Sequence, residues 1–202
     1  HVGTALELLK RIPASFDRGR AASVLFLALK AAGQQKRLVR QDRDYILETF
    51  DAIDSDDEHA SGVNNAFRKV FPLLTMLNAV SDLGDPELVN RALSYKQDRL
   101  AQAAALMTRL TPMESALMAQ YYLMALHNLG RLETAVPDLD AYLRALAASS
   151  AALDPAGPWF PNGVALPYVV ETLWMFGRPD LVSPALIERM LASLAAHSSQ
   201  PQ

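Results

Sequence analysis

One stretch of the sequence occurs twice, and this repeat limits the folds that the chain can adopt. Residues 82–89 read DLGDPELV and return 93 positions later, at 175–182, as MFGRPDLV. A shorter copy, NLGRLE, lies between them at 128–133. Consecutive glycines of the three copies are 46 and 47 residues apart. These glycines are Gly84, Gly130 and Gly177. A repeat of this length is typical of stacked pairs of helices.

Each copy has the composition of a tight turn between two helices. Glycine is favoured just beyond a helix because it adopts the left-handed conformation without a Cβ clash. A proline follows in two of the copies, where its fixed φ suits the first turn of the next helix. Gly33 lies 51 residues before Gly84, and we interpret it as the turn of a fourth, divergent copy. The sequence therefore predicts an all-α fold, a right-handed stack of about four antiparallel helical hairpins.

The period-3.6 pattern of apolar residues places these hairpins along the chain. We expect one domain over residues 1–202, in which residues 149–163 form an irregular loop. The hairpins are expected at approximately 14–53, 61–110, 112–148 and 164–196.

Prolines and caps refine the expected helices. Pro72 predicts a kink or a split in the helix that contains it. The helix that Pro86 opens is expected to continue to about Leu110. Thr111 and Glu114 bracket a proline in the pattern of a capping box, which predicts that a helix begins at Pro112.

The period of about 47 residues is compatible with an α-solenoid. Residues 125–135, in which Leu129-Gly130 is followed by Ala135, resemble the interior of a tetratricopeptide repeat. The whole resemblance extends over about 25 residues. Leu123 and Tyr142 stand where that repeat has a small glycine and alanine. The period also exceeds the ~34 residues of a tetratricopeptide unit and is closer to HEAT-like spacing. The expected architecture is therefore a TPR- or HEAT-like stack.

Composition excludes several classes of function. The 202 residues include no cysteine, which rules out disulfides, thiolate nucleophiles and cysteine metal sites. The formal net charge of −3 gives no reason to expect nucleic acid or an anionic membrane as a partner. The most apolar run, residues 21–29, is too short to span a bilayer. We expect a soluble, cytoplasmic protein without a cofactor.

The most prominent acidic cluster is residues 54–59, DSDDEH. Clustered acids can bind a hard cation, or one of them can act as a general acid when its pKa is raised. Asp54, Asp56 and Asp57 resemble the DxDD pattern of class II terpene cyclases, which would imply protonation of an isoprenoid. Glu58 and His59 depart from the Thr-Ala that usually follows. We interpret the cluster as a solvated loop before the next helix.

Aromatic residues are concentrated in the C-terminal third. Trp159 and Phe160 lie between prolines in the predicted loop, and Tyr168 and Trp174 follow. These side chains could close a pocket or contact a partner, or the loop could fold back to cap the last hairpin. Tyr121 lies where adjacent helices are expected to face each other, which predicts a core or groove residue.

Of the four histidines, His127 lies within an apolar helix and is expected to pack rather than to catalyse. No helix carries a His-x-x-x-His or Glu-x-x-His pair, so we expect no metal site.

Three functions are compatible with these patterns. The favoured one is a non-enzymatic module that binds a protein or peptide through its concave face, with Trp159, Phe160, Tyr121, Tyr168 and Trp174, together with His127, as candidate contacts. The alternative is an apolar pocket for an isoprenoid- or lipid-like molecule, in which the acids 54–57 act as an acid or a cation site. The third is an oligomerisation domain.

Overall fold

The computed structural model describes residues 2–12, 15–34, 38, 40–54, 64–153 and 164–198. All regular elements within these residues are helices, which confirms the all-α prediction. None of the helices in this part of the chain is both long and apolar enough to cross a membrane. Contacts divide the chain into two compact units, His1–Arg109 and Leu110–Gln202. The boundary falls between the second and third predicted hairpins.

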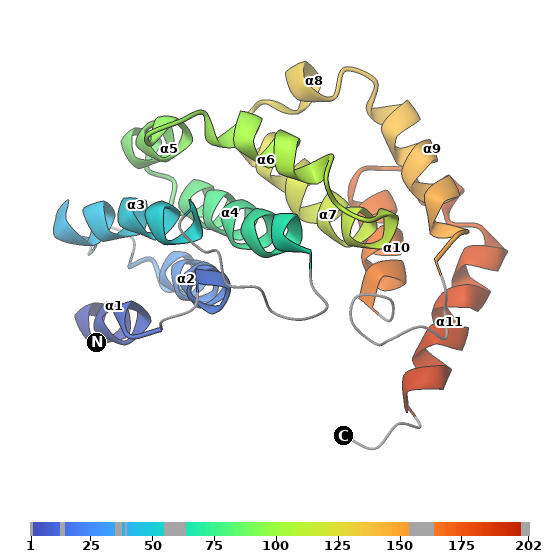
Figure 1. Ribbon diagram of the computed structural model, residues 1–202, viewed down its shortest axis with the longest axis horizontal. Coiled ribbons are helices and arrows are strands. Elements are labelled where there is room, and N and C mark those ends of the chain that lie inside the picture. The colour runs from blue at the N-terminus through green and yellow to red at the C-terminus, as the bar shows by residue number, and fades with distance from the viewer. Residues whose placement is uncertain are drawn as a thin grey trace. The chain divides into compact units, whose positions relative to one another are not determined.

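The first unit is built around α4 (Asn65–Asp82). This helix packs against α2, α3, α5 and α6, while α1 packs against α2. Figure 1 shows α2 and α6 on opposite sides of α4. The buried residues of α4 form an unbroken run from Pro72 to Val80, and this helix contributes more buried apolar residues to the unit than any other helix. The other helices of the unit are α1 (Val2–Lys10), α2 (Ser15–Ala31), α3 (Arg40–Asp54), α5 (Pro86–Ser94) and α6 (Arg99–Met107).

Helices α2 and α4 approach closely because α2 has no side chain at one contact. Gly19 of α2 is buried, and a Cβ built on it would lie 2.6 Å from the Cβ of Pro72 in α4. Pro72 lies in the middle of α4, which continues as one helix from Asn65 to Asp82. The predicted split at Pro72 is therefore wrong. The packing of the pyrrolidine ring against Gly19 gives the proline a place in the core.

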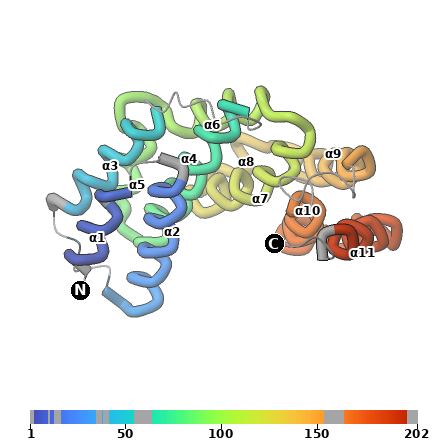
Figure 2. The backbone as a smooth tube through the Cα atoms, turned by 60° about the horizontal axis from the view of Figure 1, so that its bottom comes forward, coloured from blue at the N-terminus to red at the C-terminus, as the bar shows by residue number. Residues whose placement is uncertain are grey.

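The second unit is built around α10 (Val164–Met175), which packs against α7, α9 and α11. Figure 2 shows α10 beside α11. The faces of α10 that meet these neighbours carry Leu166, Val169 and Leu173, all fully buried. The other elements are α7 (Pro112–Asn128), α8 (Leu132–Ala135), α9 (Leu139–Ser150), the 3-10 turn η3 (Pro179–Leu181) and α11 (Pro184–Ser198).

The glycines of the sequence repeat end helices as expected. Gly84 and Gly177 have φ angles of 67° and 75°, in the left-handed region that side chains other than glycine rarely adopt. At Gly177 the amide donates to the carbonyl of Trp174, and the next amide, of Arg178, donates to Leu173. This pair of bonds is a Schellman motif, which satisfies carbonyls at the end of α10. Gly33 and Gly130 also have positive φ, so all four predicted turns are present.

Side-chain caps set the other helix boundaries. The capping box of α7 is confirmed, because the Thr111 amide donates to Glu114 Oε2 at 2.9 Å and Thr111 Oγ1 accepts from the Glu114 amide. The predicted single helix over residues 86–110 is wrong, since α5 ends at Ser94 and α6 begins at Arg99. Asp98 caps α6 by accepting from the amides of Leu100 and Ala101. A capping side chain at this position favours a new helix start over a continuous helix.

Replacement of Gly19 by alanine tests the close contact between α2 and α4. Gly19→Ala is expected to lower the free energy of unfolding by about 1–3 kcal/mol, because the added methyl group overpacks against Pro72. Gly3→Ala in α1 is the control, since a Cβ there meets no atom within 4 Å. It should be neutral or stabilise by up to about 1 kcal/mol. Urea unfolding of both variants measures this, and equal effects would contradict the proposed contact.

A second test concerns Tyr142 in α9. Burial raises the pKa of its phenol to about 12, and the neighbouring Tyr122 adds to the rise. The unfolded phenol titrates near 10, so the stabilisation is complete below pH 10 and is lost as the pH rises through 12. Urea unfolding of the Tyr142→Phe variant should therefore show a smaller loss of stability between pH 10 and 12 than the wild type. An identical pH dependence would contradict the burial of the phenol.

Candidate functional site

An aromatic face forms where α7 packs against α10. Tyr121 on α7 and Tyr168 on α10 are half-buried, and their hydroxyl oxygens lie 3.1 Å apart. Their rings stack with a centroid distance of 5.8 Å and an interplanar angle of 26°. The apolar parts of both rings are thus partly sheltered, and one of the two hydroxyls donates a hydrogen bond to the other. A rigid tyrosine pair of this kind offers a contact area that loses little conformational entropy on binding.

His127 and Trp174 lie farther along the same two helices. His127 is exposed, and its imidazole meets the ring of Phe176 edge-on at a centroid distance of 6.4 Å. The Trp174 side chain is 64% exposed and the neighbouring Met175 is 49% exposed. Gln120 Nε2 on α7 lies 3.2 Å from the sulfur of Met175, which holds the end of α10 against α7.

Helical spacing places these side chains along a ridge that winds around each helix, since residues six apart differ by about 120° in direction. Tyr121 and His127 are separated by six residues, with Met124 midway between them, and positions three apart are neighbours on a helix surface. Tyr168 and Trp174 have the same spacing on α10, with the exposed Glu171 midway. The matching positions of the two helices differ by 47 residues, which is the spacing of the glycine repeat. We call the six residues at these positions the α7–α10 face.

The structure thus brings four of the six predicted contact residues onto one pair of helices. Tyr121 and Tyr168 touch directly, whereas His127 contacts Phe176. The prediction that His127 packs within the helix pair is only partly right, because its side chain remains exposed. Trp159 and Phe160 lie outside the described residues, as does most of the predicted loop.

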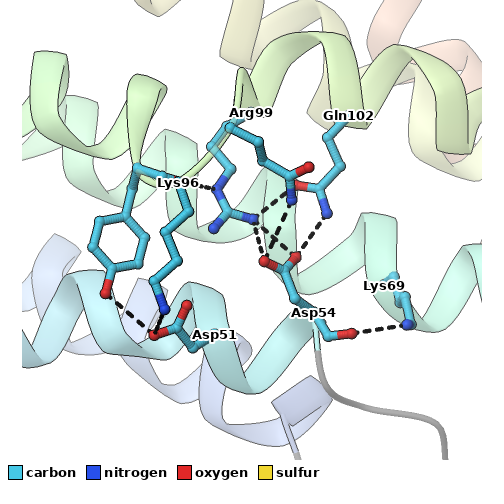
Figure 3. A network of polar contacts seen from close by, with 8 residues as sticks. Asp51, Asp54, Lys69, Lys96, Arg99 and Gln102 are labelled. Atoms are coloured by element: carbon cyan, nitrogen blue, oxygen red, sulfur yellow. Dashed lines mark hydrogen bonds and ion pairs between the residues drawn. The ribbon is translucent and has the colours of Figure 1, made fainter.

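A separate polar network joins α3 to α6 in the first unit (Figure 3). Its centre is Arg99, which is fully buried and whose Nη1 donates to both carboxylate oxygens of Asp54 at 2.9 and 2.8 Å. Gln102 Nε2 donates to the same carboxylate at 2.7 Å. The guanidinium carbon lies 5.1 Å from the ring centroid of Phe50 and 5.8 Å from that of Tyr95. The buried charge is therefore both paired and covered by aromatic rings.

The second part of the network lies on the exposed side of α3. Asp51 Oδ2 accepts from Lys96 Nζ at 2.8 Å and from the Tyr95 hydroxyl at 3.2 Å (Figure 3). The hydrogen bond to Asp51 raises the pKa of Lys96, because the carboxylate favours the ammonium form. Burial, followed by the bond to Asp51, raises the pKa of Tyr95. The ammonium and the phenol thus both remain protonated at neutral pH.

This geometry changes the interpretation of the acidic cluster. Asp54 is the last residue of α3 rather than part of a loop, and its carboxylate is engaged with Arg99. Residues 55–59 lie outside the described part of the chain. No three His, Asp or Glu side chains in the described residues come together as metal ligands. Within those residues, the acid of this cluster has a structural partner.

Sequence reasoning did not find Arg99 or Lys96. The sequence does contain a pattern that could have identified them, because each is separated from its acidic partner by 45 residues, close to the repeat period. Arg91 and Asp44, 47 residues apart, form a third such pair at 2.9 Å. Opposite charges separated by one period would have indicated these pairs.

Removal of the Asp54 carboxylate tests the network. Asp54→Ala is expected to lower the free energy of unfolding by about 3 kcal/mol, because it leaves the Arg99 charge buried without its partner. This value is at the lower end of the usual range because the Asp54 side chain is 30% exposed. Asp51→Ala, which breaks the exposed pair with Lys96, should cost less stability than Asp54→Ala.

The double variant Asp54→Ala, Arg99→Met separates the charge from the loss of packing. It should be more stable than Asp54→Ala alone, because no unpaired charge remains buried. Equal stabilities of the two variants in denaturant unfolding would show that the buried charge is not the cause.

Comparison of the chain with protein-family models, with curated proteins and with solved structures finds no match. The functional interpretation therefore depends on the geometry of the chain itself.

Proposed function

We propose that this chain is a TPR- or HEAT-like helical-repeat module that binds a protein or peptide partner through the α7–α10 face. The observation that carries the proposal is Trp174, a large aromatic side chain that is 64% exposed on α10, the helix that also carries Tyr168 of the stacked tyrosine pair. Tryptophan and tyrosine are the residues most enriched among those that dominate binding energy at protein interfaces.

The spacing of contacts within each unit supports the repeat. Stacked repeats place residues that are one period apart next to each other. In the first unit, Asp54 contacts Arg99 and Asp51 contacts Lys96, both at a separation of 45 residues. In the second unit, Tyr121 contacts Tyr168 at a separation of 47 residues. Contacts at this separation arise in both units, as expected when successive hairpins stack in register.

The order of helix packing gives the same support. In the first unit, α2 precedes one predicted turn and α4 the next, and these two helices pack together. The second helix of the first pair, α3, also packs against α4. In the second unit, α10 likewise contacts both α7 and α9, the helices of the preceding pair. This order of packing is the one expected if each unit contains two hairpins of which the second covers the first.

The chemistry of the face indicates the kind of partner. Tyr121, Tyr168 and Trp174 provide flat apolar surfaces with polar edges, which suit an extended or helical segment that carries aliphatic or aromatic side chains. Glu171, exposed between Tyr168 and Trp174, adds a negative charge and favours a basic residue in the partner. We propose a short segment with apolar anchors and at least one lysine or arginine.

Selection of peptides from a random display library on the wild-type protein tests this function. Enriched peptides should share apolar and basic positions and bind in solution. Trp174→Ala should weaken their binding by about tenfold or more, as expected for an anchor residue at an interface. Tryptophan fluorescence measured in a Trp159→Phe background reports directly on Trp174, and its emission should shift to shorter wavelength when a peptide covers the indole.

The matched control is Val24→Ala, which removes a side chain that is 63% exposed in α2, in the other unit. It should leave the affinity of the selected peptides unchanged. If Trp174→Ala and Val24→Ala bind the peptides equally well, or if the indole emission does not respond to binding, the α7–α10 face is not the binding site.

A further inference from the structure

Tyr121 of α7 and Tyr168 of α10 bring two oxidisable side chains into direct contact. Their hydroxyl oxygens are 3.1 Å apart, whereas their ring centroids are 5.8 Å apart, so the two rings converge toward their hydroxyl ends. The ring planes are inclined to each other by 26°. In each ring the two ortho carbons flank the carbon that bears the hydroxyl. The ortho carbons of both rings therefore lie toward the converging end of the pair.

These ortho carbons are the atoms at which two tyrosines can couple. A tyrosine that loses one electron and its phenol proton becomes a neutral phenoxyl radical, whose unpaired electron is shared between the oxygen and the ortho carbons. Two such radicals combine by forming a carbon–carbon bond between ortho carbons. The hydrogen atom on each coupled carbon then moves to the oxygen of the same ring, which restores both phenols. The product is dityrosine.

Two further features of the pair favour this coupling. Both side chains are half-buried, so each retains some exposure to the water that accepts the phenol proton. Both also belong to the second unit, in which α7 and α10 pack directly against each other. Two radicals formed on these helices are already held side by side, which turns a bimolecular encounter into a reaction within one molecule.

We propose that Tyr121 and Tyr168 form a site of oxidative modification, at which a peroxide acting by one-electron steps joins the two rings as dityrosine. The O–O bond of the peroxide breaks and takes up two electrons, one from each ring, while the two phenol protons pass to water. The new bond links α7 to α10 between positions 47 residues apart. This reaction requires no partner protein, so its test is independent of the proposed recognition of a peptide.

Oxidation of the full chain with peroxydisulfate and a photoexcited tris(bipyridine)ruthenium complex tests the proposal. Peroxydisulfate is a peroxide, and its cleavage to two sulfate ions accepts the two electrons. The wild type should develop the blue fluorescence of dityrosine and remain a monomer on a denaturing gel. Proteolysis after arginine separates the two tyrosines, because Arg131 and Arg144 lie between them. Mass spectrometry should then find the two peptides joined, with a mass two hydrogen atoms below their sum.

Phenylalanine variants assign the bond to this pair. Tyr121→Phe and Tyr168→Phe keep the aromatic ring but cannot form a phenoxyl radical, and each should lower the yield of the joined peptides by about tenfold or more. Tyr122→Phe is the matched control, because Tyr122 is half-buried and lies in the same peptide but points about 100° away around α7. Its yield should stay within about twofold of the wild type, since the contact between the reacting rings is unchanged.

Two measurements on the wild type need no substitution. Unfolding in urea before oxidation should lower the yield of the joined peptides by about tenfold or more, because the rings are then no longer held together. The cross-linked protein should unfold at a higher urea concentration than the untreated protein, because a covalent link restricts the unfolded chain.

Circular dichroism of each variant before oxidation confirms that the helices are intact. The proposal is overturned if the wild type forms no dityrosine while its methionines become oxidised, or if the joined peptides occur only in dimers. Equal yields from Tyr121→Phe and Tyr122→Phe, or from the folded and the urea-unfolded wild type, would also overturn it.

Discussion

The constraint on which this structure depends is the reversal of the chain after the first helix of each pair. A helix leaves carbonyl groups unsatisfied at its C-terminus, and a chain that is to turn back at once must satisfy them within two or three residues. At Gly130 and Gly177 a left-handed residue does so, because it lets the next amide reach back to the carbonyls of Leu126 and Leu173. A side chain at either glycine would strain a backbone with φ above 60°. Because these turns are short, α7 packs against α9 and α10 packs against α11. Each helix of such a pair buries the apolar side of the other.

Where a glycine does not hold a turn, polar side chains do. Lys96 is the one residue other than glycine with positive φ in the described part of the chain, at 59°. Such a conformation costs roughly 1–2 kcal/mol and persists only when its surroundings fix it. Here the Lys96 ammonium is bound to Asp51 and lies 5.4 Å from the Tyr95 ring centroid, while Asp98 caps the helix that follows. The strained turn directs Arg99 inward onto Asp54, so one turn fixes both the break between α5 and α6 and the buried ion pair.

The sequence allowed the helical class and the glycine turns to be predicted because both depend on local chemistry. Gly84, Pro86 and the Thr111–Glu114 capping box act on backbone groups within a few residues of themselves. The split expected at Pro72 and the single helix expected over 86–110 failed because tertiary contacts decided them. Gly19 on another helix accommodates Pro72, and Asp51 on another helix holds Lys96. Tyr121 and Tyr168 are 47 residues apart, so the repeat period would have indicated their contact, although it was not used in this way to predict contacts.

Exposed apolar residues also occur in the first unit, and their chemistry explains why they carry less functional weight. Leu8, Val24 and Leu27 are between 49% and 63% exposed on α1 and α2. Scattered aliphatic residues are common on protein surfaces, and leucine and valine are under-represented among the residues that dominate binding. Trp174 differs because it is a large exposed aromatic side chain, and the two helices α7 and α10 also carry a stacked tyrosine pair and an exposed histidine. Aromatic surfaces of this kind offer broad contact to a polypeptide segment.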